Sequence, residues 1–219
     1  QGYRHKGLNE FNRYLQAIFA DATYHIQAQP VCEPGATDLT AAPVSRKMKT
    51  TPSNIRKRLG LPKNRKMIMI TAGGAPKNYG FIDKLRREKD IHFILPGATA
   101  TEAIGDNLIL LPENSAYFHP DLINAADVVV GKAGYSTIAE IYQAGVPFGY
   151  VARSENREMK PLVDFVENHM CGMPIKESDF QDGTFTNSLT KLLQMPRSQD
   201  KRPNGADQIA GFIVEVLKN

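Results

Sequence analysis

A glycine, two hydroxyl residues and a carboxylate follow one another where the chain is expected to pass from a strand into a helix. Gly134 precedes Ser136 and Thr137, and Glu140 comes four residues after Ser136. The first amides of a helix have no partner within it and carry partial positive charge, so an anion is favoured there. Glycine lets the backbone come close to such an anion. The pattern predicts a phosphate site at the start of a helix.

The carboxylate of Glu140 suits the hydroxylated part of a ligand. An ionised carboxylate only accepts hydrogen bonds, and residues four apart share one helix face, so Glu140 lies one turn beyond Ser136. Phosphates at the helix start and two ribose hydroxyls on Glu140 would together suit a nucleoside diphosphate. Two simpler explanations stay open: Ser136 could merely cap the helix, and Glu140 could be a first-turn acid favoured by the helix dipole.

The neighbouring residues predict the elements that place this site. The three valines at 128–130 predict a strand buried on both faces, as in a parallel sheet. Gly131 and Gly134 are expected to bracket a short turn. The helix that follows has an apolar stripe that begins at Ile138, and Gly145 is expected to end it.

Strands alternate with helices from Met67 onward. The expected strands are 67–72, 91–95, 108–111, 128–130 and 148–151, and the expected helices include 51–59, 79–88, 121–125, 136–144, 158–168, 185–193 and 206–218. This alternation indicates an α/β fold with a doubly wound, mostly parallel, Rossmann-like sheet. In a 3-2-1-4-5 strand order, the first and fourth strands are neighbours.

A second glycine loop, Gly73-Gly74, follows the first expected strand. Ligands of such sheets lie beyond the carboxyl ends of the strands, where the strand order reverses. Two glycine loops beside one crevice favour a phosphate-bearing ligand more than either loop does alone. A Gly-Gly pair by itself indicates a tight turn as readily as it indicates a ligand-binding loop.

The two ends of the chain are expected to differ in packing. Apolar spacing predicts an amphipathic helix over 9–20, and 21–26 could form a short strand. A helix and a strand cannot bury their own apolar faces. We therefore expect residues 1–38 to be the remnant of a preceding N-terminal domain or linker, and 39–219 to form the ligand-binding domain. The apolar residues of the last helix, 206–218, are expected to point inward.

Composition narrows the class of protein. Of 219 residues, 42% are hydrophobic and 23% charged, which is enough for a sizeable core. No apolar run approaches the roughly 20 residues that span a bilayer, and no signal segment opens the chain. Cys32 and Cys171 are isolated, so we expect reduced thiols and no metal site. The expectation is a cytoplasmic protein with at most peripheral membrane contact.

The net charge of +4 is unevenly spread, because no acid occurs between Asp38 and Asp83. A basic segment of this kind could attract nucleic acid, anionic lipid or a phosphorylated substrate. It lacks interleaved aromatic residues and any nucleic-acid motif, so we expect no nucleic-acid partner. A solvated basic connector and helix is the simplest explanation.

Several motifs are missing from the sequence. There is no GxGxxG after the first strand, which disfavours a nicotinamide or flavin cofactor, and no GxxxxGK[ST], which excludes a Walker-type NTPase. The absence of GxSxG counts against an α/β-hydrolase. Among the histidines, His119 alone is expected in a strand-end loop. We expect no cofactor.

The run from Asp127 to Glu140, followed by Ala144-Gly145-Val146-Pro147, resembles the donor-binding half of GT-B glycosyltransferases. The likeness is greatest to the MurG-like and UDP-glucuronosyltransferase-like groups. The family pattern is an acidic residue, an apolar strand, two glycines, a hydroxyl residue and a glutamate, then Gly-x-Pro. The run Gly-Lys-Ala-Gly-Tyr-Ser-Thr is also similar to the glycosyltransferase-like domain fused to some sugar kinases. The resemblance covers roughly residues 41–219.

The resemblance implies a role for each matching position. The glycine and hydroxyl residues at the helix start would hold the diphosphate, with Lys132 offsetting its charge, and Glu140 would bind the ribose hydroxyls. The loop 112–119 would contact the base, and 153–158 would contact the donor sugar. The expected nucleotide-sugar-binding residues are Gly73, Gly74, Phe118, Lys132, Gly134, Tyr135, Ser136, Thr137, Glu140, Arg153 and Glu158.

The sequence departs from the family in two places. Many members carry an acidic residue and a glutamine after the fifth strand, whereas 153–158 reads Arg-Ser-Glu-Asn-Arg-Glu, so the donor sugar stays open. GT-B enzymes usually take their catalytic base from an N-terminal acceptor domain. Residues 1–38 would be only the last helix and strand of such a domain, so no catalytic residue is assigned.

The resemblance implies the donor-binding domain of a hexosyltransferase-type enzyme. It would hold a nucleotide diphosphate sugar, expected to be UDP-linked, for transfer to an unknown acceptor. Transfer would also need an N-terminal domain that is missing from this sequence. No metal would be obligatory. The alternative is a non-catalytic module that binds a nucleotide or phosphosugar and regulates a partner. A nucleotide-sugar epimerase would need acids and histidines that do not stand at fitting positions. The acceptor, the stereochemical course and the oligomeric state stay open.

Overall fold

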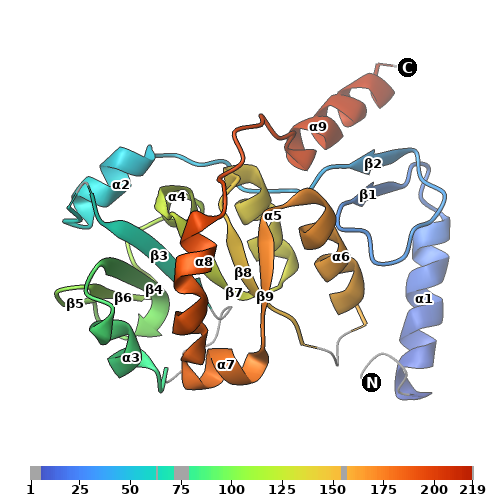
Figure 1. Cartoon of the computed structure of the whole chain (residues 1–219). Coiled ribbons are helices and arrows are strands. Elements are labelled where there is room, and N and C mark those ends of the chain that lie inside the picture. Colours follow the sequence, from blue (N-terminus) through green and yellow to red (C-terminus); the bar gives the residue numbers. More distant parts are fainter. Residues whose placement is uncertain (1–5, 63, 72–78, 154–156, 219) are drawn as a thin grey trace.

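The computed structural model describes residues 6–62, 64–71, 79–153 and 157–218 (Figure 1). A seven-stranded sheet forms its centre, in the order β5-β6-β4-β3-β7-β8-β9. The strands are β3 (Lys66–Thr71), β4 (Ile91–Thr99), β5 (Ala103–Ile104), β6 (Leu108–Pro112), β7 (Val128–Lys132), β8 (Phe148–Val151) and β9 (Gly172–Ile175). β5 runs antiparallel to β6, and the other neighbouring pairs are parallel. The predicted α/β fold with a mostly parallel sheet is confirmed.

The strand order confirms the predicted arrangement of the five expected strands and adds two at the edges. β3 and β7 are neighbours, and Ile68 is in register with Val128. The short edge strands β5 and β9 were not predicted, and β9 lies where the sequence indicated only the end of a helix near Gly172. β4 continues through Pro96 to Thr99, beyond its expected end, with an irregular register between those two residues.

Helices cover both faces of the sheet (Figure 1). One core contains apolar residues of α2 (Pro52–Arg58), α4 (His119–Ala125), α5 (Tyr135–Ala144) and α6 (Met159–His169). The other contains residues of α3 (Ile82–Arg87), η3 (Thr184–Ser188) and α8 (Leu189–Gln194), with Phe180 of α7 (Glu177–Asp182) packed against it. The helix expected over 185–193 is therefore split into η3 and α8, and α7 was not predicted.

The central strands are apolar without interruption because each face meets a different core. On β3, Met69 belongs to the core beside α5 while Ile70 belongs to the core beside α8. On β7, Val129 and Val130 divide in the same way. A strand buried on both faces leaves no position for a polar residue.

Elements from both ends of the chain lie beside the main layers. A two-stranded parallel sheet joins β1 (Ile26–Ala28) to β2 (Leu39–Ala41), and α9 (Gly205–Val216) contacts β2. η2 (Lys6–Leu8) leads into α1 (Asn9–Ala20), which stands at the right of Figure 1. The strand expected over 21–26 begins only at Ile26.

The apolar stripes of α1 and α9 remain largely exposed. Phe11 and Phe19 of α1 are 63% and 64% exposed, and no residue of α1 is buried. The expectation that the apolar residues of α9 point inward is wrong for Ile213 and for Leu217, just after the helix, which are 46% and 80% exposed. Ile209, Phe212 and Val216 are half-buried, and Gly205 is the one buried residue of α9. Periodicity shows that a helix has an apolar face, but it does not show what covers that face. None of the helices among the described residues has the length and apolarity needed to cross a bilayer.

Asp127 ties three elements together at the amino end of β7. Its Oδ2 accepts hydrogen bonds from Nη2 of Arg56 at 2.6 Å and from the amide of Met67 at 2.7 Å. Burial by itself would raise the pKa of this carboxyl, but the Met67 amide and the Arg56 guanidinium lower it overall. Ionised Asp127 therefore stabilises the packing of α2 on β3 and β7.

We expect Asp127→Asn to lower the free energy of unfolding at pH 7 by about 2 kcal/mol, because a half-buried charged hydrogen bond is lost. The pKa of Asp127 is lower in the folded chain than its ordinary 3.8. Its stabilisation is thus complete above about pH 4 and is lost as the pH falls through the folded pKa. Urea denaturation of both proteins at pH 7 and pH 3 should show the difference shrinking at pH 3. A difference that stays the same, or an equal loss in Asp83→Asn, whose carboxylate is exposed, would contradict this.

Candidate functional site

The phosphate site predicted at the start of α5 lies beside the carboxyl ends of β7 and β8. The expectation that Gly131 begins a turn is wrong, because β7 continues through Gly131 to Lys132. A Cβ on Gly131 would lie 2.1 Å from the carbonyl oxygen of Thr71. Gly131 therefore permits the close approach of β7 to β3 and is a structural residue.

Gly134 has a different role from Gly131. It is the N-cap of α5 in an extended conformation, with φ −124° and ψ 150°, which other residues also adopt. A Cβ there would meet no atom of the described residues within 4 Å. Among the described residues, no atom fills the space beside this helix start, as a ligand approaching the backbone would require.

The first turn of α5 contains the hydroxyl residues expected at the site. Its first helical hydrogen bond runs from the amide of Ile138 to the carbonyl of Gly134, so the amides of Tyr135, Ser136 and Thr137 precede it. The alternative in which Ser136 caps the helix is wrong, because Gly134 is the N-cap and Ser136 is an exposed residue within the first turn. These three amides can therefore offer donors to an anion.

Glu140 is a buried carboxylate, with 3% of its surface exposed. Its Oε1 accepts a hydrogen bond from Nε of Arg46 at 2.8 Å, and Nη2 of the same guanidinium lies 2.7 Å from this oxygen. Its Oε2 lies 2.7 Å from Nδ1 of His119, the first residue of α4. Glu140 is beyond the first turn of α5, so the first-turn acid explanation is wrong. The sequence placed His119 in a strand-end loop without predicting its pairing with Glu140, and it placed Arg46 in the basic segment without assigning it to the site.

The electrostatics of this cluster favour the ionised form of Glu140. Burial by itself raises the pKa of the carboxyl, but the hydrogen bonds and charges of His119 and Arg46 outweigh burial and lower it. The side chain of Arg46 is 58% exposed, whereas that of Glu140 is 4% exposed. The guanidinium thus reaches the desolvated carboxylate from the solvent side.

Phe118 belongs to the same cluster. It is the N-cap of α4, and Cζ of Arg46 and Nζ of Lys49 lie 5.0 and 4.4 Å from the centre of its ring. Cations near an aromatic face are attracted to its electrons. Tyr117 interacts with Arg58 of α2 in the same way, at 4.8 Å. The basic segment has few aromatic residues of its own, but the fold supplies these two.

The backbone around Arg46 is anchored on both sides. Oδ1 of Asp121 accepts hydrogen bonds from the amides of Lys49 and Thr50, at 2.7 and 3.2 Å. The side-chain Nδ2 of Asn204 donates a hydrogen bond to the carbonyl of Ser45 at 2.9 Å. The segment 42–50 therefore has a defined path between the start of α9 and α4.

Of the other predicted residues, Lys132 and Tyr135 flank the start of α5, and two glycines lie outside the described residues. Lys132 ends β7 and is half-buried. Tyr135 donates its hydroxyl proton to the carbonyl of Gln29 at 2.8 Å, and burial raises the pKa of its phenol. Gly73 and Gly74 are not among the described residues.

Arg153 and Glu158 border the loop expected to contact a sugar. Nε of Arg153 lies 3.2 Å from a carboxylate oxygen of Glu177, which begins α7. Glu158 is the N-cap of α6, although its side chain makes no capping hydrogen bond there. The structure therefore turns Arg153 toward α7 and does not join it to the Glu140 cluster.

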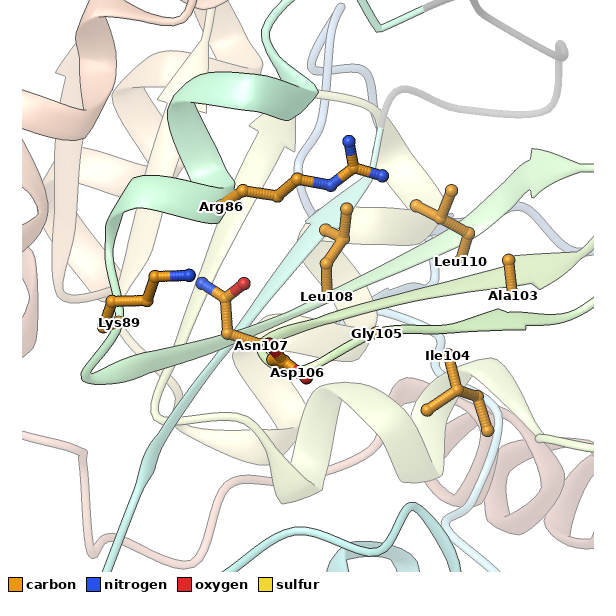
Figure 2. A pocket seen from close by; sticks show the side chains of 9 residues that line it. All are labelled: Arg86, Lys89, Ala103, Ile104, Gly105, Asp106, Asn107, Leu108 and Leu110. Atoms are coloured by element: carbon orange, nitrogen blue, oxygen red, sulfur yellow. The ribbon is translucent and has the colours of Figure 1, made fainter.

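Three pockets among the described residues are lined by residues other than Glu140. One of about 450 Å³ lies at the carboxyl ends of β4 and β6, where Pro112 and Asn114 contribute to its wall. Another, of about 420 Å³, lies between the loop 29–34 and α6. The third, of about 350 Å³, is shown in Figure 2, where the side chain of Arg86 of α3 extends above Leu108 of β6 toward Leu110. Only the first lies next to the loop expected to contact a base. No group of three or more His, Cys, Asp or Glu among the described residues is placed to hold a metal ion.

Comparisons with known proteins find a family-model match and two relatives in sequence. Residues 110–215 match the family model of the glycosyltransferase family 28 C-terminal domain. L-arabinokinase of Arabidopsis thaliana is 26% identical over 184 residues, which cover 84% of this chain and 17% of the relative. The UDP-N-acetylglucosamine–N-acetylmuramyl-(pentapeptide) pyrophosphoryl-undecaprenol N-acetylglucosamine transferase of Bacillus licheniformis is 26% identical, and the match covers 99% of this chain and 63% of that relative. The chain thus spans less than two thirds of either relative.

Solved structures show the same fold. MurG of Acinetobacter baumannii superposes with a TM-score of 0.53 at 15% identity, covering 92% of this chain and 69% of that one. The calicheamicin glycosyltransferase superposes with a TM-score of 0.52 at 10% identity, covering 89% of this chain and 52% of that one. The resemblance predicted from the sequence is confirmed: the chain has the fold of GT-B glycosyltransferases and contains a match to the family 28 C-terminal domain.

The two glycines before α5 should respond differently to a methyl group. We expect Gly131→Ala to lower the free energy of unfolding by at least about 2 kcal/mol, because the methyl overlaps the Thr71 carbonyl and β7 must shift. Gly134→Ala should change it by less than about 1 kcal/mol, because its backbone is extended and the space is open. Chemical denaturation of the two variants tests this. Equal losses would show that both glycines serve packing.

Proposed function

We propose that this domain of GT-B fold binds the donor of a glycosyltransferase: a nucleoside diphosphate sugar, and in the first instance a UDP-sugar. One observation carries the proposal. A buried, ionised carboxylate, Glu140, lies one turn beyond a helix start whose amides precede the first helical hydrogen bond. This pairing of anion-binding amides with an acceptor for hydroxyl groups matches a diphosphate next to a ribose.

The diphosphate would lie against the first turn of α5. The amides of Tyr135, Ser136 and Thr137 would donate to it, and the open space at Gly134 would let it approach. Lys132 would add positive charge at the end of β7. During transfer, negative charge grows on the departing diphosphate, and fixed donors of this kind stabilise it without an obligatory metal.

The remaining contacts follow from the position of the loops. The base would lie near Phe118 and the pocket at the ends of β4 and β6, with Gly73 and Gly74 lining the cleft. The sugar would meet the loop that Arg153 and Glu158 border. The unusual sequence of this loop leaves the identity of the sugar to experiment.

The acceptor and the catalytic base would come from a second unit. The exposed apolar residues of α1 and α9 support such a unit, because they form surface that a neighbouring domain could cover. This chain is therefore assigned donor binding, and no residue of it is assigned the role of catalytic base. Free thiols at Cys32 and Cys171 fit a reducing, cytoplasmic location, which we also propose.

A non-catalytic module is the second candidate. The match to L-arabinokinase covers 84% of this chain but 17% of that relative, so a domain like this one also occurs within a larger kinase. Such a module would bind a nucleotide or phosphosugar and transfer nothing. A preceding Rossmann domain in the same gene would favour the enzyme, and a fused kinase would favour the module.

A panel of nucleotides tests both candidates by thermal unfolding. A ligand at 100 times its dissociation constant stabilises the folded state by about 2.7 kcal/mol. We expect UDP and UDP-sugars to raise the unfolding temperature more than ADP, GDP or dTDP do. Absence of any shift across the panel would overturn both candidates, and a preference for another nucleotide would correct the base.

The ribose role of Glu140 has its own test. We expect Glu140→Gln to weaken UDP binding at least about tenfold, because a charged acceptor of hydroxyl protons is lost. Calorimetry well below the unfolding temperature measures the affinity. Asp164→Asn is the matched control, because it removes an exposed carboxylate that pairs with Lys160 on α6. Unchanged affinity in Glu140→Gln would disprove the ribose assignment.

A further inference from the structure

We propose that Arg46 is an internal competitor for the ribose site: its guanidinium binds the carboxylate that a ribose would use, and a nucleotide must displace it. The inference rests on the proposed nucleotide function. It concerns which group holds Glu140 before and after a ligand binds, and it assigns to the segment 42–50 a part in setting nucleotide affinity.

The contacts of Glu140 show the competition. Nε of Arg46 donates a hydrogen bond to Oε1 at 2.8 Å, its Nη2 lies 2.7 Å from the same oxygen, and Nδ1 of His119 lies 2.7 Å from Oε2. Both carboxylate oxygens therefore already have a partner, and two nitrogen atoms of the guanidinium cover Oε1. A ribose hydroxyl that donates to Oε1 needs the space that the guanidinium occupies, so the Arg46 contact has to give way.

Arg46 is the partner that can leave. Its side chain is 58% exposed, compared with 29% for His119. His119 is held at the first position of α4, whereas Arg46 lies in a segment without helix or strand. An arginine side chain in solvent can change rotamer without disturbing the core. A ligand approaching from solvent therefore meets the guanidinium first.

The backbone need not move when the side chain swings. The carbonyl of Ser45 accepts a hydrogen bond from Asn204, and Asp121 holds the amides of Lys49 and Thr50. Arg46 thus pivots about a fixed Cα between these anchors.

The released guanidinium remains near the site. Ser136 is one helical turn from Glu140, which corresponds to about 5.4 Å along the axis. A guanidinium on a flexible side chain can cover that distance and pair with a phosphate. A ligand with both a ribose and a phosphate therefore offers the guanidinium a phosphate in place of the carboxylate that the ribose takes. A nucleoside has no phosphate and offers no such partner.

The test compares UDP with 2′-deoxy-UDP, which carry the same phosphates and differ by one ribose hydroxyl. Calorimetry gives the ratio of their dissociation constants. In the wild-type chain, Arg46 competes with that hydroxyl and keeps the ratio small. In Arg46→Ala, we expect the ratio to rise about tenfold, the change that 1.4 kcal/mol produces. Arg46→Gln, which keeps the packing of the stem, should raise the ratio in the same direction and serves if the alanine variant fails to fold.

Lys47→Ala is the matched control. It removes the same charge from the adjacent position, where Nζ of Lys47 pairs with Oδ1 of Asp207 of α9 at 2.7 Å. Its ratio should equal that of the wild type. A ratio that stays unchanged or falls in both Arg46 variants, while UDP still binds, overturns the competitor role and leaves the proposed function standing. Failure of the wild-type chain to bind UDP, or a ratio of one in every protein, overturns the ribose assignment as well.

Discussion

The buried negative charge of Glu140 is the constraint on which the site depends. A carboxylate removed from water is costly unless it is paired and hydrogen-bonded. The chain meets this cost with Arg46 and His119, which are 94 and 21 residues away in sequence. Their pairing brings the segment 42–50, the start of α4 and the second turn of α5 to one place at the carboxyl edge of the sheet.

The sheet beneath the site makes this meeting possible. Gly131 lets β7 lie against Thr71 of β3 at a distance that no side chain would allow. Two apolar cores then hold β3 and β7 from opposite faces, and Asp127 fixes their amino ends to Arg56. The helix start at Gly134 is consequently presented by a rigid support. A site of this kind can select a ligand by position, because its donors are fixed before the ligand arrives.

The features that could be predicted from the sequence are those with a local or periodic signal. Three adjacent valines predicted β7, the glycine at 145 predicted the end of α5, and the alternation of elements predicted the strand order. The pairing of Arg46 with Glu140 has no such signal, because it depends on where a segment without regular structure crosses the sheet edge. The short strand β9 contains Pro174 and few residues, so its pattern was too brief to recognise. The apolar stripe of α9 predicted burial, but a stripe does not show which element covers it, and Ile213 and Leu217 remain exposed among the described residues.

The central claim is that a nucleoside diphosphate binds at the start of α5. Amide chemical shifts of the ¹⁵N-labelled chain, recorded during titration with UDP, test it most directly. The account predicts that the largest shifts occur at Ser136, Thr137 and Glu140 and at His119 of the same cluster. Asn107, in the pocket between α3 and β6, should show none. Shifts confined to the surroundings of Asn107, or no shifts at saturating UDP, would contradict the account.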